Sequence, residues 1–197
     1  MKGNPFIGFV PWIIFWVVSG PSTWEWAALG AALAAIILMI PSIERGNPKI
    51  LDTATAIFFI VLSLVALFVD RQTLGLLEHY SQLISYGVLA IVAFGSLLFM
   101  PFTEQYARET VPREHWDSPT FKRINRVLTA MWGTVFVLLA LCQVVYEIAP
   151  SQKSLFNWII PIVLIVGAFK FTAWYPEQQS RRVNQRPPET PSSQRVR

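Results

Sequence analysis

The stretch AIFFIVLSLVALFV, residues 56–69, decides the fold class of this protein because it is apolar along nearly its whole length. Its residues do not alternate between polar and apolar, as those of a transmembrane β-strand do. The bilayer core offers no water to backbone N–H and C=O groups, so a segment that enters it must form its hydrogen bonds internally. The stretch therefore predicts a membrane-spanning α-helix, and an all-α fold for the chain.

Five further apolar segments accompany this one. Of the 197 residues, 53% are hydrophobic and 14% are charged, whereas a soluble domain carries about 25% charged residues. This balance predicts a polytopic helical membrane protein with about six transmembrane helices in one domain, residues 1–175. The predicted spans are 6–19, 23–40, 51–69, 83–101, 127–149 and 157–175.

The first of these segments is short for a span. Its 14 residues make about 21 Å of helix, against a hydrocarbon core of about 30 Å. It either crosses a locally thinned bilayer or forms a re-entrant hairpin with the second segment, and the sequence leaves both arrangements open.

Basic residues are distributed unevenly between the loops. With six spans, thirteen Lys and Arg residues lie on one side of the membrane and only Arg71 and Lys153 lie on the other. Cytoplasmic loops carry the excess of basic residues, so we expect both termini in the cytoplasm. The tail, residues 176–197, has four prolines, five arginines and no aromatic residue, which predicts a disordered segment held near an anionic leaflet.

A charged cytoplasmic loop, residues 102–126, separates the fourth and fifth predicted spans and holds nine of the 28 charged residues. Thr103 is expected to cap a short helix that Pro112 interrupts. Ser118 and Pro119 predict the start of a second helix, which begins in water and enters the membrane near Val127. Aromatic residues are interleaved with these charges, a composition typical of partner recognition and of anchoring at a membrane interface. The predicted docking and interfacial residues are Tyr106, Arg108, Trp116, Phe121, Arg123 and Asn125.

Two charged residues lie within predicted spans. Asp52 and Lys170 fall at similar shallow depths near the cytoplasmic face, so they could form an intramembrane ion pair. Alternatively, the amine of Lys170 reaches the interface along its flexible stem, and Asp52 is stabilised by the dipole at the start of its helix.

The sequence contains no motif that demands a cofactor or a metal. A phosphate-binding loop, GxSxG, HExxH and CxxC are all absent from it. The single cysteine, Cys142, excludes an internal disulfide framework, and the spacing of His115 and Asp117 fits no recognised metal site. We expect no cofactor, no metal and no nucleic-acid partner, and we regard enzymatic activity as the less favoured alternative.

A short pattern at the start of the fifth predicted span resembles a known family. It consists of Phe121, Lys122, Arg123, Ile124 and Asn125, followed by Trp132, in a chain that also has an early Pro-Trp pair at 11–12 and several short spans. With this arrangement the chain resembles the intracellular septation protein A family (YciB or IspZ-like) of bacterial inner-membrane proteins. The resemblance implies a role in cell-envelope organisation or septation through protein partners of the envelope machinery, with no established enzymatic activity.

Two other functions remain as alternatives. The chain could be a small transporter or channel with its cytoplasmic mouth near Asp52, Lys170 and Asn125. It could also be a membrane enzyme that acts on lipid headgroups through acidic residues of the loop 102–126. The favoured hypothesis is a multi-pass protein of the bacterial inner membrane that contacts anionic lipids and docks proteins through this loop. A homo-oligomer is compatible with it.

Overall fold

The computed structural model describes residues 5–20, 23–148 and 153–184, which form helices and no strands. Two short 3₁₀ segments, Pro5–Phe9 (η1) and Arg113–His115 (η2), and one π-helical turn, Leu155–Ile159 (η4), accompany the α-helices. The α-helices are α1 (Val10–Val18), α2 (Trp24–Glu44), α3 (Ile50–Phe68), α4 (Arg71–Ser96), α5 (Phe102–Ala107), α6 (Pro119–Ile148) and α7 (Ile160–Asn184).

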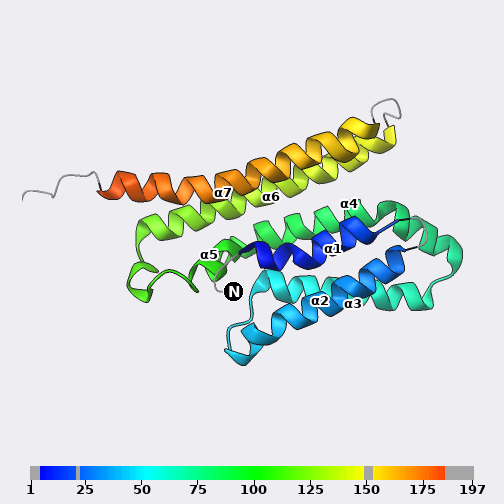
Figure 1. Ribbon diagram of the computed structural model, residues 1–197, viewed down its shortest axis with the longest axis horizontal. Coiled ribbons are helices and arrows are strands. Elements are labelled where there is room, and N and C mark those ends of the chain that lie inside the picture. The colour runs from blue at the N-terminus through cyan, green and yellow to red at the C-terminus, as the bar shows by residue number, and fades with distance from the viewer. Residues whose placement is uncertain (1–4, 21–22, 149–152, 185–197) are drawn as a thin grey trace, which may run out of the picture.

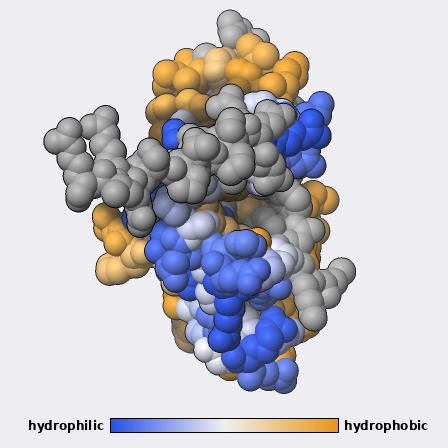
Figure 2. Space-filling model, turned by 90° about the vertical axis from the view of Figure 1, so that its left-hand side faces the viewer, coloured by the Kyte–Doolittle hydropathy of each residue, from blue (hydrophilic) through white to orange (hydrophobic). Residues whose placement is uncertain are grey.

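The long helices run between two ends of an elongated bundle (Figure 1). Helix α2 packs against α1 and α3, α4 packs against α6, and α7 lies beside α6. One end, at the left in Figure 1, contains the turn 45–49, α5, the segment 108–118 and the last turns of α7; we call it the polar end. Hydrophilic residues gather at the polar end, and hydrophobic residues cover its flanks (Figure 2).

Four helices among the described residues are long and apolar enough to cross a membrane: α2, α3, α6, and α7 together with η4. The exterior supports this assignment, because large hydrophobic side chains such as Val17, Leu67 and Phe68 are more than three-quarters exposed. A surface of this kind suits contact with lipid rather than water. Helix α1 is apolar but shorter than these four helices. Helix α4 begins and ends at residues other than those predicted.

Helix α4 was expected over 83–101, but it begins at Arg71 and ends at Ser96. Its start is set by Asp70, whose Oδ1 accepts hydrogen bonds from the backbone N–H groups of Gln72 and Thr73 at 2.9 and 3.0 Å. An N-cap of this kind satisfies donors at the first turn of a helix. A search for apolar runs therefore misses the polar first half of this long helix.

The start of α6 is confirmed at Pro119, where Ser118 Oγ accepts a hydrogen bond from the backbone N–H of Phe121 at 3.2 Å. The prediction that Thr103 caps the preceding helix is wrong, because α5 begins at Phe102. The Thr103 side chain turns inward instead. Its Oγ1 donates to the backbone carbonyl of Asn125 at 2.9 Å.

Helix α7 continues to Asn184 with Pro176 inside it. The expectation of disorder is therefore corrected for residues 176–184, while residues 185–197 lie outside the described part of the chain. Proline lacks the N–H that would bond the carbonyl four residues earlier, but this helix continues beyond it.

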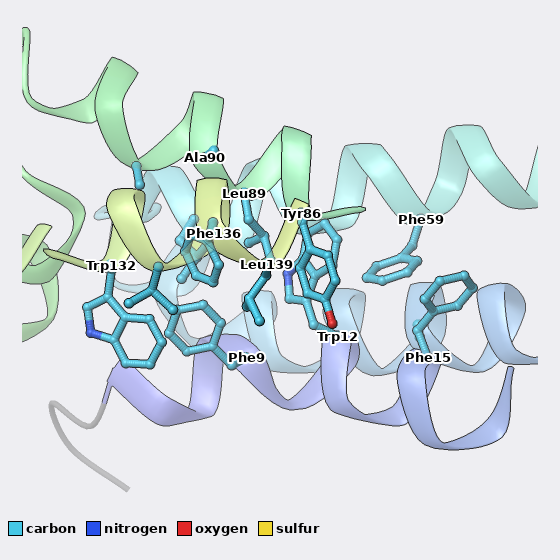
Figure 3. Packing of buried hydrophobic residues seen from close by; sticks show 14 of the residues in the cluster. Phe9, Trp12, Phe15, Phe59, Tyr86, Leu89, Ala90, Trp132, Phe136 and Leu139 are labelled. Atoms are coloured by element: carbon cyan, nitrogen blue, oxygen red, sulfur yellow. The ribbon is translucent and has the colours of Figure 1, made fainter. Parts of the chain in front are cut away.

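Aromatic side chains of η1 and α1 contact both α6 and α3 (Figure 3). The ring of Phe9 stacks on that of Trp132 of α6, with centroids 5.0 Å apart. Trp12 stacks on Phe58 of α3 at 5.0 Å, and its Nε1 donates a hydrogen bond to Thr55 Oγ1 at 2.8 Å. Although α1 is the shortest of the apolar helices, one face of it packs into the core through Trp12 and Phe15, while Val17 and Val18 on its other face are exposed.

We predict that Phe136→Ala, which empties a site only 2% exposed between η1 and α6, will lower the free energy of unfolding by about 3–5 kcal/mol. Phe68→Ala is the matched control, because the same atoms are removed from a side chain that is 86% exposed. Thermal unfolding of both variants in detergent micelles measures the difference. Equal losses for the two variants would contradict the assigned core.

Candidate functional site at the polar end

Helix α5 has a mixed polar sequence, yet residues 102–106 are all buried. It can be buried because its polar side chains have partners within the protein. Gln105 Oε1 accepts a hydrogen bond from the backbone N–H of Ile50 at 2.7 Å, and its Nε2 donates to the carbonyl of Met100 at 3.1 Å. Glu104 Oε1 is 2.6 Å from Arg108 Nη2. Helix α5 is thus fastened to the end of the bundle.

A compact charged group connects α5 to α3. The Tyr106 hydroxyl donates a hydrogen bond to Asp52 Oδ1. Lys49 Nζ lies 2.8 Å from Glu109 Oε1 and 4.2 Å above the centre of the Tyr106 ring. We call Lys49, Asp52, Tyr106 and Glu109 the Asp52 cluster. Arg45 extends it to the surface, with Nη2 3.4 Å from Glu109.

The electrostatics of the Asp52 cluster keep Tyr106 protonated. Burial disfavours the phenolate, and the negative charge of Asp52 adds to this effect, so the pKa of Tyr106 is raised above its ordinary value. The hydroxyl therefore remains a donor to Asp52 at ordinary pH. Gly8 lies so close that a side chain at this position would collide with the Tyr106 hydroxyl.

The space beside the Asp52 cluster is too small for a substrate. The cavity that Asp52 lines together with Gly8, Pro11 and Thr55 has a volume of about 10 Å³, which is room for roughly one water molecule. An acid–base group must reach the atom that it protonates or deprotonates. The cluster is therefore suited to holding α5 in place.

The structure does not bring Asp52 and Lys170 together in the expected ion pair. Asp52 accepts a hydrogen bond from Tyr106. The buried cation beside the Tyr106 ring is Lys49. Lys170 lies on α7 and is exposed. Similar depth along the bundle is not sufficient for an ion pair, because the two helices must also be neighbours.

An exposed patch follows α5. The guanidinium carbons of Arg108 and Arg113 lie 4.8 and 5.5 Å from the centre of the Trp116 ring. The Trp116 Nε1 donates a hydrogen bond to the carbonyl of Val111 at 2.8 Å, which fixes the orientation of the ring. We call Arg108, Arg113 and Trp116 the Trp116 patch.

The predicted docking residues divide into two groups. Tyr106, Phe121 and Asn125 are 2%, 8% and 2% exposed, so they cannot form part of a docking surface. Asn125 instead donates from Nδ2 to the carbonyl of Phe121 at 2.9 Å. Arg123 is exposed, and Arg108 and Trp116 are partly exposed.

Neither Lys49 nor Gln105 was predicted as a site residue, and Glu109 was considered only as one of several loop carboxylates that could act in hydrolysis. Lys49 was used only in the count of basic residues, although a lysine just before an apolar helix that begins with an aspartate is a local signal. Gln105 and Glu109 carry no such signal, because Ile50 and Lys49, the partners that connect them to the start of α3, are distant in the sequence.

A groove of about 680 Å³ opens on another side of the segment 108–118, between that segment, the first turns of α6 and the last turns of α7. Buried Phe121 and Leu128 line it, together with exposed Thr110, His115 and Ser180. Its volume lies in the range of about 300–1,000 Å³ that is usual for small-molecule sites. No group of three or more His, Cys, Asp and Glu suited to a metal ion is present in the described part of the chain.

These features define a helical protein with apolar flanks and with a polar end closed by the buried helix α5. No family model, no curated protein and no solved structure matches the chain. The resemblance to the septation family therefore stays a prediction, and function is argued from the residues of the polar end.

We predict that Lys49→Met will lower the free energy of unfolding by about 3–5 kcal/mol, because it leaves the carboxylates of Asp52 and Glu109 without their buried cation. Combining it with Asp52→Asn should cost less than the sum of the two single changes. Thermal unfolding in detergent measures this coupling.

Lys170→Met provides the matched control, because it removes the same atoms from an exposed position. It should have little effect and should add independently to Asp52→Asn. Coupling of Asp52 to Lys170 rather than to Lys49 would overturn this assignment.

Proposed function

We propose that this chain is a non-enzymatic membrane protein of the bacterial cell envelope that docks protein partners through the Trp116 patch. We further propose that six segments cross the inner membrane and that both termini and the polar end face the cytoplasm. The uneven distribution of basic residues supports the orientation. The resemblance of residues 121–132 to the septation family supports the role in envelope organisation.

The observation that carries the docking proposal is the fixed geometry of the Trp116 patch. Tryptophan and arginine supply much of the energy of protein interfaces, and binding costs less when side chains are already ordered. Here the Trp116 ring is held by Val111 and by two guanidinium groups, and Arg108 is itself tied to Glu104. Burial of α5 in turn anchors the segment that carries the patch.

The alternatives have less support from the same contacts. The transporter or channel hypothesis placed the cytoplasmic mouth near Asp52, Lys170 and Asn125. Asp52 bonds Tyr106, Asn125 bonds its own helix, and Lys170 is exposed on α7. Hydrolysis of a headgroup relied on the loop carboxylates, of which Glu104, Glu109 and Asp117 each pair with a basic residue.

Labelling of introduced cysteines tests the orientation. The only cysteine, Cys142, is buried, which keeps the background low. A membrane-impermeant maleimide added to intact spheroplasts should label Gln72→Cys and Lys153→Cys but not Arg113→Cys, and permeabilisation should expose the third site. Labelling of Arg113→Cys in intact spheroplasts would refute the proposed orientation.

Site-specific photocrosslinking tests the docking function. A photoreactive amino acid at exposed Glu114 should form a defined crosslinked product with a partner in living cells. Trp116→Ala should abolish that product, and the variant should fail to restore normal envelope morphology to cells that lack the protein. Trp174→Ala is the matched control, because Trp174 is exposed on α7 and lies outside the patch.

The competing functions give a different pattern. If Trp116→Ala still forms the product and restores envelope morphology but Asp117→Asn does neither, a carboxylate is required and the docking proposal fails. Expression level and thermal unfolding of each variant establish that the chain is folded.

A further inference from the structure

The groove beside the segment 108–118 has an uncharged lining, although that segment is itself rich in charge. None of the described residues that line the groove is an aspartate, a glutamate, a lysine or an arginine. The titratable residue of the lining, His115, lies 3.5 Å from the exposed carboxylate of Glu114. The groove therefore offers no counter-charge to an anionic or a cationic ligand. Because a charge without a partner is costly to withdraw from water, these walls favour a neutral ligand.

The groove is elongated along α6 and α7. On each helix its lining residues are spaced three or four positions apart, so they share one face of that helix. They are Phe121, Ile124, Asn125 and Leu128 on α6, and Thr172, Pro176 and Ser180 on α7. Each row covers about two helical turns, or roughly 10–12 Å. Both helices are long and apolar enough to cross a membrane, so a hydrocarbon chain can reach the groove from the bilayer.

Three of the lining hydroxyl groups already donate within the protein. Thr172 Oγ1 and Ser180 Oγ donate to the carbonyls four residues earlier in α7, at 2.8 and 3.0 Å. Thr110 Oγ1 donates to the carbonyl of Ala107 at 3.1 Å. These hydroxyl groups can offer a ligand only the lone pairs of their oxygens, so this part of the lining suits a ligand that donates a hydrogen bond.

Asn125 adds a further acceptor to the wall of the groove. The residue is only 2% exposed, and its Nδ2 donates to the carbonyl of Phe121, which identifies the other atom of the amide as the oxygen. No described residue donates a hydrogen bond to this Oδ1, and it is not among the fully buried side-chain atoms that lack a partner. Since Asn125 lines the groove, we take the remaining access to Oδ1 to be from the groove. A ligand donor there would satisfy an acceptor that is otherwise costly to bury.

We propose that the groove binds a neutral lipid with a free hydroxyl group, of the diacylglycerol class. The hydroxyl group donates to Asn125 Oδ1. The first part of one acyl chain packs on Phe121 and Leu128, which are buried, and on half-buried Ile124, while the rest of the lipid stays in the bilayer. The site uses no residue of the Trp116 patch, so it is independent of the proposed docking function.

The test compares three lipids that share one dioleoylglycerol backbone, by native mass spectrometry of the purified full chain. They are dioleoylglycerol, its acetyl ester, which lacks the hydroxyl donor, and dioleoyl phosphatidic acid, which adds negative charge. The unmodified protein should retain one dioleoylglycerol about fivefold more than the ester, as expected for one hydrogen bond. It should also retain dioleoylglycerol in preference to phosphatidic acid.

Asn125→Leu should abolish the preference for dioleoylglycerol over its ester, because the acceptor is lost. Gln143→Leu is the matched control, since it removes an amide from a half-buried position of the same helix that does not line the groove. It should leave the preference unchanged. Thermal unfolding establishes that each variant is folded, and the comparison of lipids on the unmodified protein does not depend on any variant.

Ile124→Trp fills the groove from a half-buried position and should reduce retention of dioleoylglycerol by about tenfold. Val137→Trp is its matched control, because Val137 is 40% exposed on the same helix and does not line the groove. This control should retain lipid as the unmodified protein does.

Any of four results would overturn the proposal. The unmodified protein retains dioleoylglycerol and its ester equally, or it retains phosphatidic acid more strongly than dioleoylglycerol. A folded Asn125→Leu variant keeps the full preference for the hydroxyl group, or a folded Ile124→Trp variant retains as much lipid as the unmodified protein.

Discussion

The hydrogen bond between Tyr106 and Asp52 is the contact on which the polar end depends. It joins α5, a short polar helix, to the first turn of the apolar helix α3. A carboxylate withdrawn from water needs compensation, which the hydroxyl and the nearby ammonium of Lys49 supply. Once α5 is fixed, the segment after it is fixed as well, and with it one wall of the groove and the whole Trp116 patch.

Features determined by neighbouring residues were predictable from the sequence. The start of α6 follows from Ser118 and Pro119, because capping and the preference of proline for the first turn are local effects. The apolar runs likewise predicted helices. Helix α4 was located only in part because an apolar run was taken as its limit, although Asp70 offered a capping signal before the polar half.

Features determined by distant residues were not predictable. Tyr106 and Asp52 are 54 positions apart, and no pattern within either segment indicates the other. The choice of Lys49 over Lys170 as the cation near Asp52 depends on which helices become neighbours. For the same reason, the aromatic residues of the charged loop could not be sorted into buried Tyr106 and partly exposed Trp116 before the structure placed α5 inside the bundle.

The packing of α1, and of η1 before it, has a consequence for the order of assembly. Their aromatic partners lie on α3 and, through Phe9, on α6. During synthesis α1 is made well before α6, so Phe9 cannot reach Trp132 until the intervening chain has left the ribosome. Such distant contacts are slow to form because the loop between them must close first. Phe9 should therefore reach its final position late, after Trp12 and Trp16 have packed against α3 and α4, and until then its ring is exposed to lipid, insertion machinery or chaperones.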